Sequence, residues 1–445
     1  MRSNREASAG SDDCPAESVA GWTVGSASEV ITPEESMWMS GWTARKKPAI
    51  GVEQDLHATA VSFEDRSGTR AVLVSVELLF VTRALRDAVA ARCRDAYGLP
   101  PNSLLVNATH THCGPILRES RIGTYGLDER RKAQASAYRS DVEETLVDLV
   151  GRALDAARPS RLTYSHGRCG FAMNRRLPSA DGVTNEPYPD GPVDHDVPVL
   201  AVESAGELRA ILFGYACHPT TMQLHLKYGG DWPGFAREHL EERYPEATVL
   251  FVMGCAGDQN PYPRGTVERA KDHGRTLALA VEAALETRGE PVRGPLQTVF
   301  EERPVEFEDP PPLEQLERMA ASDEPAERNR GRALLAELDE TGTIATTYPY
   351  RIQGVGFGTD LTLVALGGEV LVEYGLQLKS ELPGRVWVAG YSNDDFTYVP
   401  TARAIAEGGY EGGEAIRNTT FPGPLRPDVE ERILQTAAAV GRRLQ

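Results

Sequence analysis

The 445-residue sequence has few cysteines and no apolar run long enough to span a membrane. It contains six cysteines, and no two of them form a C-x-x-C pair. So sparse a set is typical of a reduced intracellular protein rather than of a disulfide scaffold. No window reaches the ~18 consecutive apolar residues of a transmembrane helix, and the first twenty residues lack the apolar core of a signal peptide. We therefore expect a cytoplasmic protein with no membrane span.

Positive charge is also scarce. The chain has 47 lysines and arginines against 65 aspartates and glutamates, a formal net charge of −18. This balance argues against nucleic acid or an anionic membrane as the main partner. Apolar residues make up 41% of the chain and charged residues 25%, as in globular proteins. Residues 1–20 are polar and small, which predicts a disordered tail, and residues 21–445 are expected to form a single domain.

Strand and helix patterns alternate along the rest of the chain. Apolar and β-branched runs predict strands at Leu56–Phe63, Ala71–Phe80, Leu104–Ala108, Val197–Val202, Ala210–Cys217, Thr248–Met253, Leu361–Leu366 and Val386–Ala389. Periodic apolar residues predict helices around Leu85–Cys93 (between a Thr82 N-cap and Gly98) and at Ser140–Ala156, Pro233–Arg243, Val267–Thr287, Leu313–Leu338, Val370–Glu381 and Asp428–Leu444. Pro310–Pro312 and the charged stretch Ser322–Arg332 indicate an inserted helical hairpin. The alternation favours an α/β fold of layered mixed sheets with flanking helices.

Histidines follow two of the predicted strands. The strand LLVNA runs into THTHCGP, which places His110 and His112 two residues apart and projects both imidazoles from one face. The strand AILFGYAC ends at His218 in the same way. Neutral imidazole is a good zinc ligand, and α/β sheets bind ligands at the carboxyl ends of their strands. The pattern indicates a metal site, while hydrogen-bonded loop or capping histidines would give the same short motifs.

Acidic and phenolic residues follow other predicted strands. The strand ATVLFVMG leads into CAGDQNPY, where small residues let the backbone approach closely and present Asp258 at the same edge. In VALGGEVLVEYG, Glu369 stands after two glycines at the opening of a helix, and Tyr398 and Tyr410 flank a glycine-rich loop. Each has an ordinary structural alternative: an Asx turn for Asp258, helix capping for Glu369 and packing for the tyrosines.

Together these motifs resemble, in order, the catalytic domain of the neutral/alkaline ceramidases and their bacterial relatives. The resemblance covers about residues 22–425 and is carried by EVITP, MSGW, KPAIGV, DLHATAV, THTHCGP, NRR, GPVDHDV, ACHPTTM, GDWPGFA, MGCAGDQNP, GGEV and FTYVPT. It implies a single zinc ion (Zn2+) held by His110, His218, Glu369 and Tyr398. It also implies four catalytic or substrate-contacting residues: His112, Arg175, Asp258 and Tyr410.

Several features depart from the ceramidase pattern. Asn260 stands where ceramidases carry the serine proposed as nucleophile, and Cys113 stands where a serine is usual. Neither an export signal nor the C-terminal β-sandwich domain of ceramidases is seen in the sequence. An amide side chain cannot attack a carbonyl as a serine does, so the resemblance is expected to extend to the metal site but not to a serine nucleophile.

The residues and the resemblance predict a zinc-dependent hydrolase that cleaves the amide bond of an N-acyl compound by attack of zinc-bound water. Because the acidic chain shows no apolar entrance or membrane-binding element, we expect a soluble small-molecule substrate rather than ceramide. Two alternatives stay open. One is ester, lactone or phosphoester hydrolysis on the same scaffold, and the other is a non-catalytic binding protein that keeps the zinc site.

Overall fold

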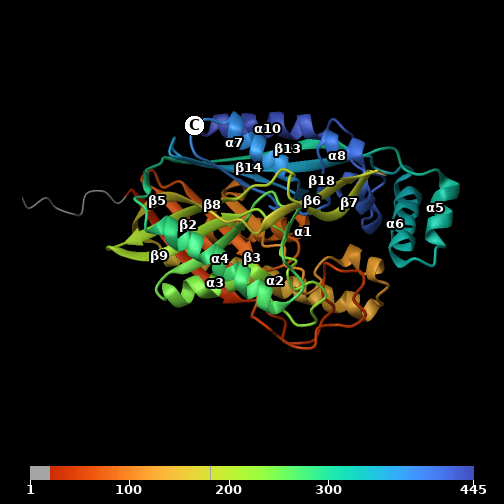
Figure 1. Cartoon of the computed structure of the whole chain (residues 1–445), viewed down its shortest axis with the longest axis horizontal. Coiled ribbons are helices and arrows are strands. Elements are labelled where there is room, and N and C mark those ends of the chain that lie inside the picture. Colours follow the sequence, from red (N-terminus) through yellow and green to blue (C-terminus); the bar gives the residue numbers. More distant parts are fainter. Residues whose placement is uncertain (1–20, 181) are drawn as a thin grey trace, which may run out of the picture.

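Two β-sheets lie face to face, and helices cover the outer face of each (Figure 1). The computed structural model describes residues 21–180 and 182–445, so the tail expected at residues 1–20 lies outside the described residues. The larger sheet has the order β10-β9-β8-β5-β1-β2-β3-β4, with β12 paired to β5. Its strands are β1 (Trp22–Val30), β2 (His57–Asp65), β3 (Arg70–Val76), β4 (Leu104–Ala108), β5 (Arg158–Arg168), β8 (Asp196–Ser204), β9 (Glu207–Tyr215), β10 (Thr248–Met253) and β12 (Glu290–Val292).

The second sheet packs its inner face on the first. It has the order β13-β14-β15-β17, and its strands are β13 (Leu296–Glu306), β14 (Thr347–Phe357), β15 (Leu361–Leu366) and β17 (Val386–Ala389). Apolar side chains of both sheets interlock between them; the rings of Phe63 and Phe357, for example, lie 5.3 Å apart edge to face. Both sheets combine parallel and antiparallel pairs. This is the predicted α/β fold of layered mixed sheets.

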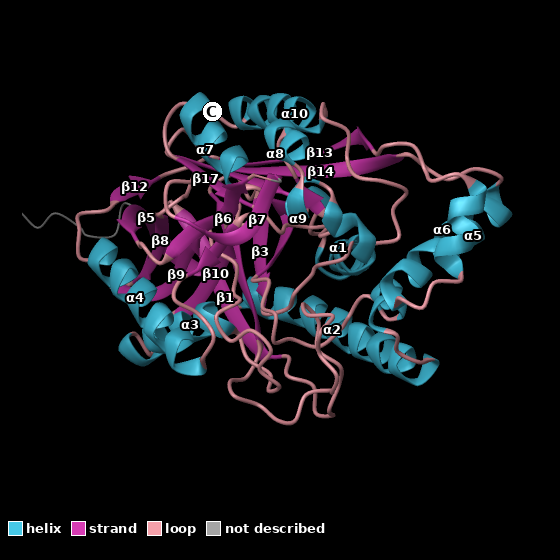
Figure 2. Ribbon diagram, turned by 45° about the vertical axis from the view of Figure 1, so that its right-hand side comes forward, coloured by secondary structure: helices cyan, strands magenta, loops and turns pink. Residues whose placement is uncertain are grey.

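Helices bury their apolar faces against the outer sides of the two sheets, as Figure 2 shows. The larger sheet is covered by α1 (Arg83–Tyr97), α2 (Glu129–Asp155), α3 (Asp231–Arg243) and α4 (Val267–Leu285). The smaller sheet is covered by α7 (Val372–Glu381) and α10 (Val429–Arg443). The predicted cap signals of α1 are confirmed, because the side chain of Thr82 accepts from the backbone N–H of Leu85 and Gly98 adopts a left-handed conformation.

The larger sheet curls until its two end strands, β4 and β10, approach each other. Asn107 of β4 fixes this approach: its Oδ1 accepts from the backbone N–H of Met253 in β10 at 2.8 Å. Its Nδ2 donates to the carbonyl oxygen of Gly390, just after β17, also at 2.8 Å. Strands that lie far apart in the sheet order therefore end close to one another, and the loops that follow β4, β9 and β10 meet.

Two small sheets and several short helices surround this meeting point. The sheets are β11-β6-β7, made of β6 (Ala172–Ser179), β7 (Gly182–Tyr188) and β11 (Gln259–Pro261), and the parallel pair β16 (Glu369–Val370) and β18 (Tyr398–Val399). The short helices are α8 (Ala402–Glu407), α9 (Gly409–Gly412), η2 (Glu119–Arg121), η3 (Gly123–Tyr125) and η4 (Glu414–Asn418). A further short helix, η1 (Pro101–Ser103), precedes β4 at the other end of that strand.

An arm of residues 307–346 projects from the hairpin of β13 and β14 (Figure 2). It contains α5 (Leu313–Ala320) and α6 (Pro325–Thr341), which confirms the inserted helical hairpin, although the run Leu313–Leu338 forms two helices rather than one. The side chain of Asn329 in α6 donates to the carbonyl oxygen of Ser120 at 3.0 Å, which ties the arm to the loops next to α2.

Across residues 21–180 and 182–445 no helix combines the length and the apolar character needed to cross a lipid bilayer.

Candidate metal centre and active site

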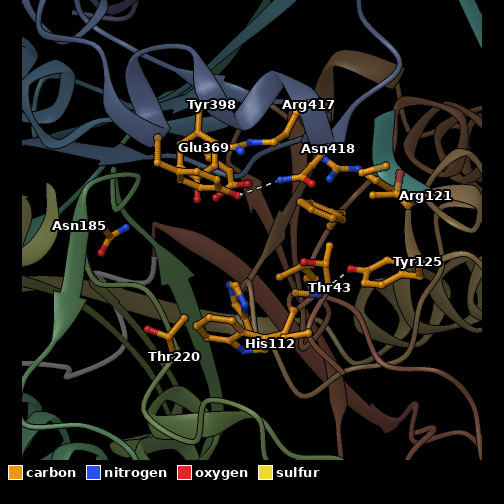
Figure 3. A pocket seen from close by; sticks show the side chains of 18 of the residues that line it. Thr43, His112, Arg121, Tyr125, Asn185, Thr220, Glu369, Tyr398, Arg417 and Asn418 are labelled. Atoms are coloured by element: carbon orange, nitrogen blue, oxygen red, sulfur yellow. Dashed lines mark hydrogen bonds between the residues drawn. The ribbon is translucent and has the colours of Figure 1, made fainter. Parts of the chain in front are cut away.

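The loops at the meeting point of the strands surround a cavity of about 940 Å³ (Figure 3). Seven of the eight predicted site residues line it, and the exception is Asp258; the seven are His110, His112, Arg175, His218, Glu369, Tyr398 and Tyr410. These residues span nearly 300 positions of sequence, so their meeting is a product of the curled sheet and of β16 and β18.

His110 and His218 are each oriented by a backbone carbonyl. Nδ1 of His110 lies 2.7 Å from the carbonyl oxygen of Leu79, and Nδ1 of His218 lies 2.6 Å from that of Ala256. A carbonyl oxygen can only accept, so Nδ1 carries a proton in both rings, and Nε2 is the nitrogen that faces the cavity and can bind a metal when it is unprotonated. Burial, followed by the positive charge of Arg175, lowers the pKa of His218 to about 4, which keeps this ring neutral at physiological pH.

Glu369 completes the centre of the cluster. Its Oε2 lies 3.2 Å from Nε2 of His110 and 3.3 Å from Nε2 of His218. Burial by itself would raise the pKa of Glu369, but the two histidines outweigh this effect and hold the pKa well below its ordinary value. Gly257 lets the backbone of Glu369 come close to its own, because a Cβ atom at position 257 would lie only 2.7 Å from the carbonyl oxygen of Glu369.

Tyr398 reaches the cluster because β16 and β18 pair in register. Glu369 and Tyr398 are direct partners across the two parallel strands. The hydroxyl of Tyr398 lies 3.4 Å from Nε2 of His218, which can only accept, and it receives a hydrogen bond from Nη2 of Arg175 at 3.0 Å. Burial, with the added charge of Glu369, raises the pKa of Tyr398 well above its ordinary value, so the side chain is a neutral phenol.

His112 lies on the other side of the cavity from Glu369 and Tyr398 (Figure 3). Its ring packs against Trp42 with the centroids 5.4 Å apart, and neither ring nitrogen has a hydrogen-bond partner among residues 21–180 and 182–445. Gly41 leaves room for it, since a Cβ atom at that position would lie 2.4 Å from Nδ1 of His112. Burial, followed by the charges of His110 and His218, lowers the pKa of His112 well below its ordinary value.

The cluster suits a metal ion. Ligand nitrogens of His110, His112 and His218 all lie within 4.8 Å of one another. Within the described part of the chain, both nitrogens of His112 are buried without a hydrogen-bond partner, and Nε2 of His110 lies near Glu369 without hydrogen-bond geometry. A bound cation would relieve this costly state. This histidine triad differs from the ligand set implied by the resemblance, which has Glu369 and Tyr398 in place of His112. Both sets share His110 and His218.

Arg175 and Tyr410 form the wall beside Tyr398. Nε of Arg175 forms a 2.7 Å ion pair with Oε1 of Glu411, and its Nη1 donates to Oδ1 of Asn260 at 3.1 Å. Each guanidinium nitrogen of Arg175 thus donates one hydrogen bond within the protein. Burial by itself would lower the pKa of Arg175, but Tyr398 and Glu411 outweigh this effect and raise it. The ring of Tyr410 lies 5.4 Å from that of Tyr398.

Asp258 and Cys113 lie behind the cavity rather than on its surface. Oδ1 of Asp258 accepts from the backbone N–H of Val372 at the start of α7, and Oδ2 accepts from Nδ2 of Asn174, at 2.8 and 2.9 Å. Burial raises the pKa of Asp258 to about 6. The buried thiol of Cys113 receives a weak hydrogen bond of 3.7 Å from Nη2 of Arg45, and burial raises its pKa to about 12.

Sequence reasoning missed the outer part of the cavity wall. Arg121 and Arg264 line it from loops, and Met319, Glu327 and Arg330 line it from the arm. None of these residues belongs to a motif or to the end of a predicted strand. A signal was present only for the arm, whose insertion the sequence indicated without saying what it would contact.

Comparisons with known proteins agree with this architecture. The structure is similar to that of neutral ceramidase from Pseudomonas aeruginosa, with a TM-score of 0.73 and 22% sequence identity over 95% of this chain and 75% of that one. It is also similar to a ceramidase complexed with C2, with a TM-score of 0.75 and 21% identity over the same shares of the two chains. No curated protein sequence matches this chain significantly.

The family model described as neutral/alkaline non-lysosomal ceramidase, N-terminal, matches residues 22–270. The matched segment contains His110, His112, Arg175, His218 and Asp258, while Glu369, Tyr398 and Tyr410 lie beyond it. The match covers more than half of the chain, and the fold and the order of the motifs agree with it. The chain therefore belongs to the neutral/alkaline ceramidase family.

Proposed function

We propose that this protein is a zinc-dependent hydrolase that cleaves the amide bond of an N-acyl compound. The observation that carries the proposal is the convergence of Nε2 of His110 and Nε2 of His218 on Oε2 of Glu369 inside the cavity. Two imidazoles and a carboxylate are a ligand set used by catalytic zinc sites. Membership of the ceramidase family supports hydrolysis as the reaction.

His110, His218 and Glu369 would hold the metal, with Tyr398 as a weaker fourth donor. When bound, zinc supplies a Lewis acid that polarises a carbonyl and makes a coordinated water acidic near neutral pH. The carbonyls of Leu79 and Ala256 keep both imidazoles in the tautomer that this role needs.

The other side chains of the cavity supply proton transfer and orientation. His112 lines the cavity, and among the described residues its ring nitrogens have no hydrogen-bond partner, so they are open to water and to the leaving amine, between which the ring can pass a proton. The phenol of Tyr410 can donate to the carbonyl oxygen as it gains negative charge. Arg175 holds Tyr398 in place through its 3.0 Å hydrogen bond.

The composition of the wall supports a soluble substrate over ceramide. Polar and charged side chains make up most of the described lining, and its larger apolar residues are Trp42, Leu79, Phe80 and Met319. Long alkyl chains are bound best by a continuous apolar surface. A short acyl group beside polar substituents matches this wall better than two long chains do.

Metal content and a substrate panel test the proposal. Purified protein should carry about one zinc per chain, lose activity on chelation and regain it with zinc, and should cleave short N-acyl amides faster than ceramide in micelles. Full activity without metal would refute the metal role. Cleavage restricted to esters, lactones or phosphoesters would show that the proposed amide hydrolysis is the wrong reaction. Turnover of ceramide without turnover of soluble amides would show that the proposed soluble substrate is wrong. A zinc-loaded protein inactive on the whole panel would be a binding protein.

A further inference from the structure

The cavity wall contains positive charge that the protein itself does not neutralise. Five arginines line it, in a chain whose net charge is −18. Three have internal partners: Arg175 pairs with Glu411, Arg417 with Glu414, and Arg330 donates to the carbonyl oxygens of Phe421 and Pro422. Within the described residues, no carboxylate lies within 4 Å of the other two, Arg121 and Arg264. An acidic protein that leaves two guanidinium groups unpaired in its cavity offers a site for a negatively charged ligand.

Arg121 is the better placed of the two. Its guanidinium lies over the ring of Phe80, 5.3 Å from the ring centroid, and that ring lies edge-on to His110 with the centroids 5.7 Å apart. A single aromatic ring thus separates this charge from the metal centre. Arg264 is farther out, where its Nη1 donates to Oγ1 of Thr220 at 3.4 Å and its guanidinium lies over the ring of Tyr262.

The segment that carries Arg121 is held in a defined position. Arg121 ends η2, and η3 follows directly. Nδ2 of Asn329, in α6 of the arm, donates to the carbonyl oxygen of Ser120 and to Oγ1 of Thr124 at 3.0 and 3.2 Å, on either side of Arg121. Figure 3 shows Arg121 beside Tyr125 and Asn418 at the cavity. The arm therefore fixes the position of a charge that lies next to the catalytic cluster.

The acidic groups nearby do not cancel this charge. Glu119 pairs with Arg139 at 3.7 Å, and Glu327 accepts from the hydroxyl of Ser322 at 2.6 Å. The charge of Arg121 also reaches the carboxyl of Asp395, but burial raises the pKa of Asp395 well above its ordinary value, so this group is neutral. The charge of Arg121 also acts on the phenol groups of the cavity, because it opposes the effect of burial on the pKa of both Tyr125 and Tyr410. Arg121 is thus an unpaired, stacked guanidinium whose donors remain available to a ligand.

We infer that the substrate is an N-acyl amino acid and that Arg121 binds its free carboxylate. This inference rests on the amide hydrolase activity proposed above and selects one class among soluble N-acyl compounds. In such a molecule the carboxylate stands only a few bonds from the scissile amide, a short spacing that suits a guanidinium one aromatic ring away from His110. A planar guanidinium matches a carboxylate with two parallel hydrogen bonds.

The test compares an N-acyl amino acid with its carboxamide, which has the same size but no charge. The wild-type protein should favour the acid in kcat/KM by about 10- to 100-fold, as expected for a charge-assisted pair. Arg121→Gln should remove this preference by slowing cleavage of the acid far more than cleavage of the carboxamide, and Arg121→Lys should retain part of the preference. Arg161→Gln, which removes a surface charge paired with Glu203, is the control for net charge and should keep the preference.

The other outcomes are equally decisive. Equal or faster cleavage of the carboxamide by the wild-type protein would overturn the inference while the amide hydrolase activity stood. Loss of the preference in Arg264→Gln but not in Arg121→Gln would overturn the assignment to Arg121. If neither compound is cleaved, the proposed function fails, and calorimetric titration of the acid into the purified protein decides the rest. Binding that is lost in Arg121→Gln would support the anion site, and no binding would refute it.

Discussion

The inner and outer walls of the cavity are built differently. The inner wall consists of His110, His218, Glu369 and Tyr398, which come from the ends of sheet strands; the first three are exposed by 1%, 1% and 6%. Backbone carbonyls and in-register strand pairing hold them. The outer wall consists of Arg121, Arg264 and the arm residues Met319, Glu327 and Arg330, which come from loops and an inserted helix pair.

We expect the inner and outer walls to have different functions. Side chains braced by a sheet keep the geometry that a metal centre requires, since such sites tolerate little displacement. Loops and insertions can change without disturbing the sheets, and binding residues are often found on them. We therefore expect changes in the inner wall to abolish the reaction and changes in the outer wall to alter which substrate is used.

The largest effect is expected from the two inner histidines. His110→Ala or His218→Ala should remove the metal and lower kcat by about 10³-fold or more, because a metal supplies several kcal/mol of transition-state stabilisation. Metal analysis beside steady-state kinetics measures both effects. His166→Ala is the matched control, since His166 is half-exposed and pairs with Asp196, and it should change neither value. Metal-free variants with wild-type turnover would contradict the expectation that changes in the inner wall abolish the reaction.

A smaller effect is expected from the phenol of the inner wall. Tyr398→Phe removes the hydroxyl that joins Arg175 to His218 and should lower kcat by about 10- to 100-fold, the range seen when groups supporting a metal site are changed. The protein should still contain its metal, because three stronger donors remain. Loss of metal as complete as in His218→Ala would show that Tyr398 is an essential ligand instead.

Introducing a serine at position 260, where ceramidases carry one, should lower activity rather than raise it. Oδ1 of Asn260 accepts from Arg175 and from the hydroxyl of Thr220. Asn260→Ser shortens this acceptor and should lower kcat/KM about 3- to 10-fold, the value of one or two hydrogen bonds. Rapid-quench intact-mass analysis of the wild-type protein should find no covalent acyl-enzyme. A mass increase equal to the acyl group, or a gain of activity in Asn260→Ser, would contradict this prediction.

The smallest effect on turnover is expected from Asp258, which lies behind the cavity and accepts hydrogen bonds from Asn174 and Val372. Asp258→Asn places an amide N–H₂ against the Nδ2 donor of Asn174 and should cost about 1–3 kcal/mol of stability, with turnover per folded molecule changed only a few-fold. Burial raises the pKa of Asp258 to about 6, so its contribution to stability is present at low pH and is lost as the pH rises through 6. The destabilisation, measured by thermal or urea unfolding, should thus be larger at pH 5 than at pH 8. A large loss of kcat at unchanged stability would instead make Asp258 catalytic.

The inner wall could be predicted from the sequence because buried strands have a clear apolar pattern. The strands Leu104–Ala108 and Thr248–Met253, which lead to His110 and Asp258, have the bounds that were predicted. The predicted strand Ala71–Phe80 was wrong at its end, since β3 stops at Val76. The apolar residues after it leave the sheet, and the carbonyls of Leu78 and Leu79 bind the backbone and the ring of His110. Hydrophobicity cannot distinguish these two uses of an apolar residue.

The outer wall could not be predicted from the sequence, because no such pattern marks its residues. Arg121 follows no strand and belongs to no motif. The role we propose for it depends on the absence of an acidic partner within the described residues, which only the three-dimensional structure can show. In β13 the strand signal is weak because charged residues interrupt a half-exposed pattern. The break between α5 and α6 did have a signal, Pro325 at the start of the second helix.

The way in which the arm is inserted bears on how such proteins can diverge. Glu306 and Thr347 are direct partners in the β13–β14 hairpin, so the arm leaves and re-enters the sheet at adjacent positions. A segment attached in this way can be exchanged, lengthened or deleted by a single genetic event while both strands keep their register. Replacing this arm, with His110, His218 and Glu369 left in place, is therefore a direct way to test whether the outer wall determines substrate preference.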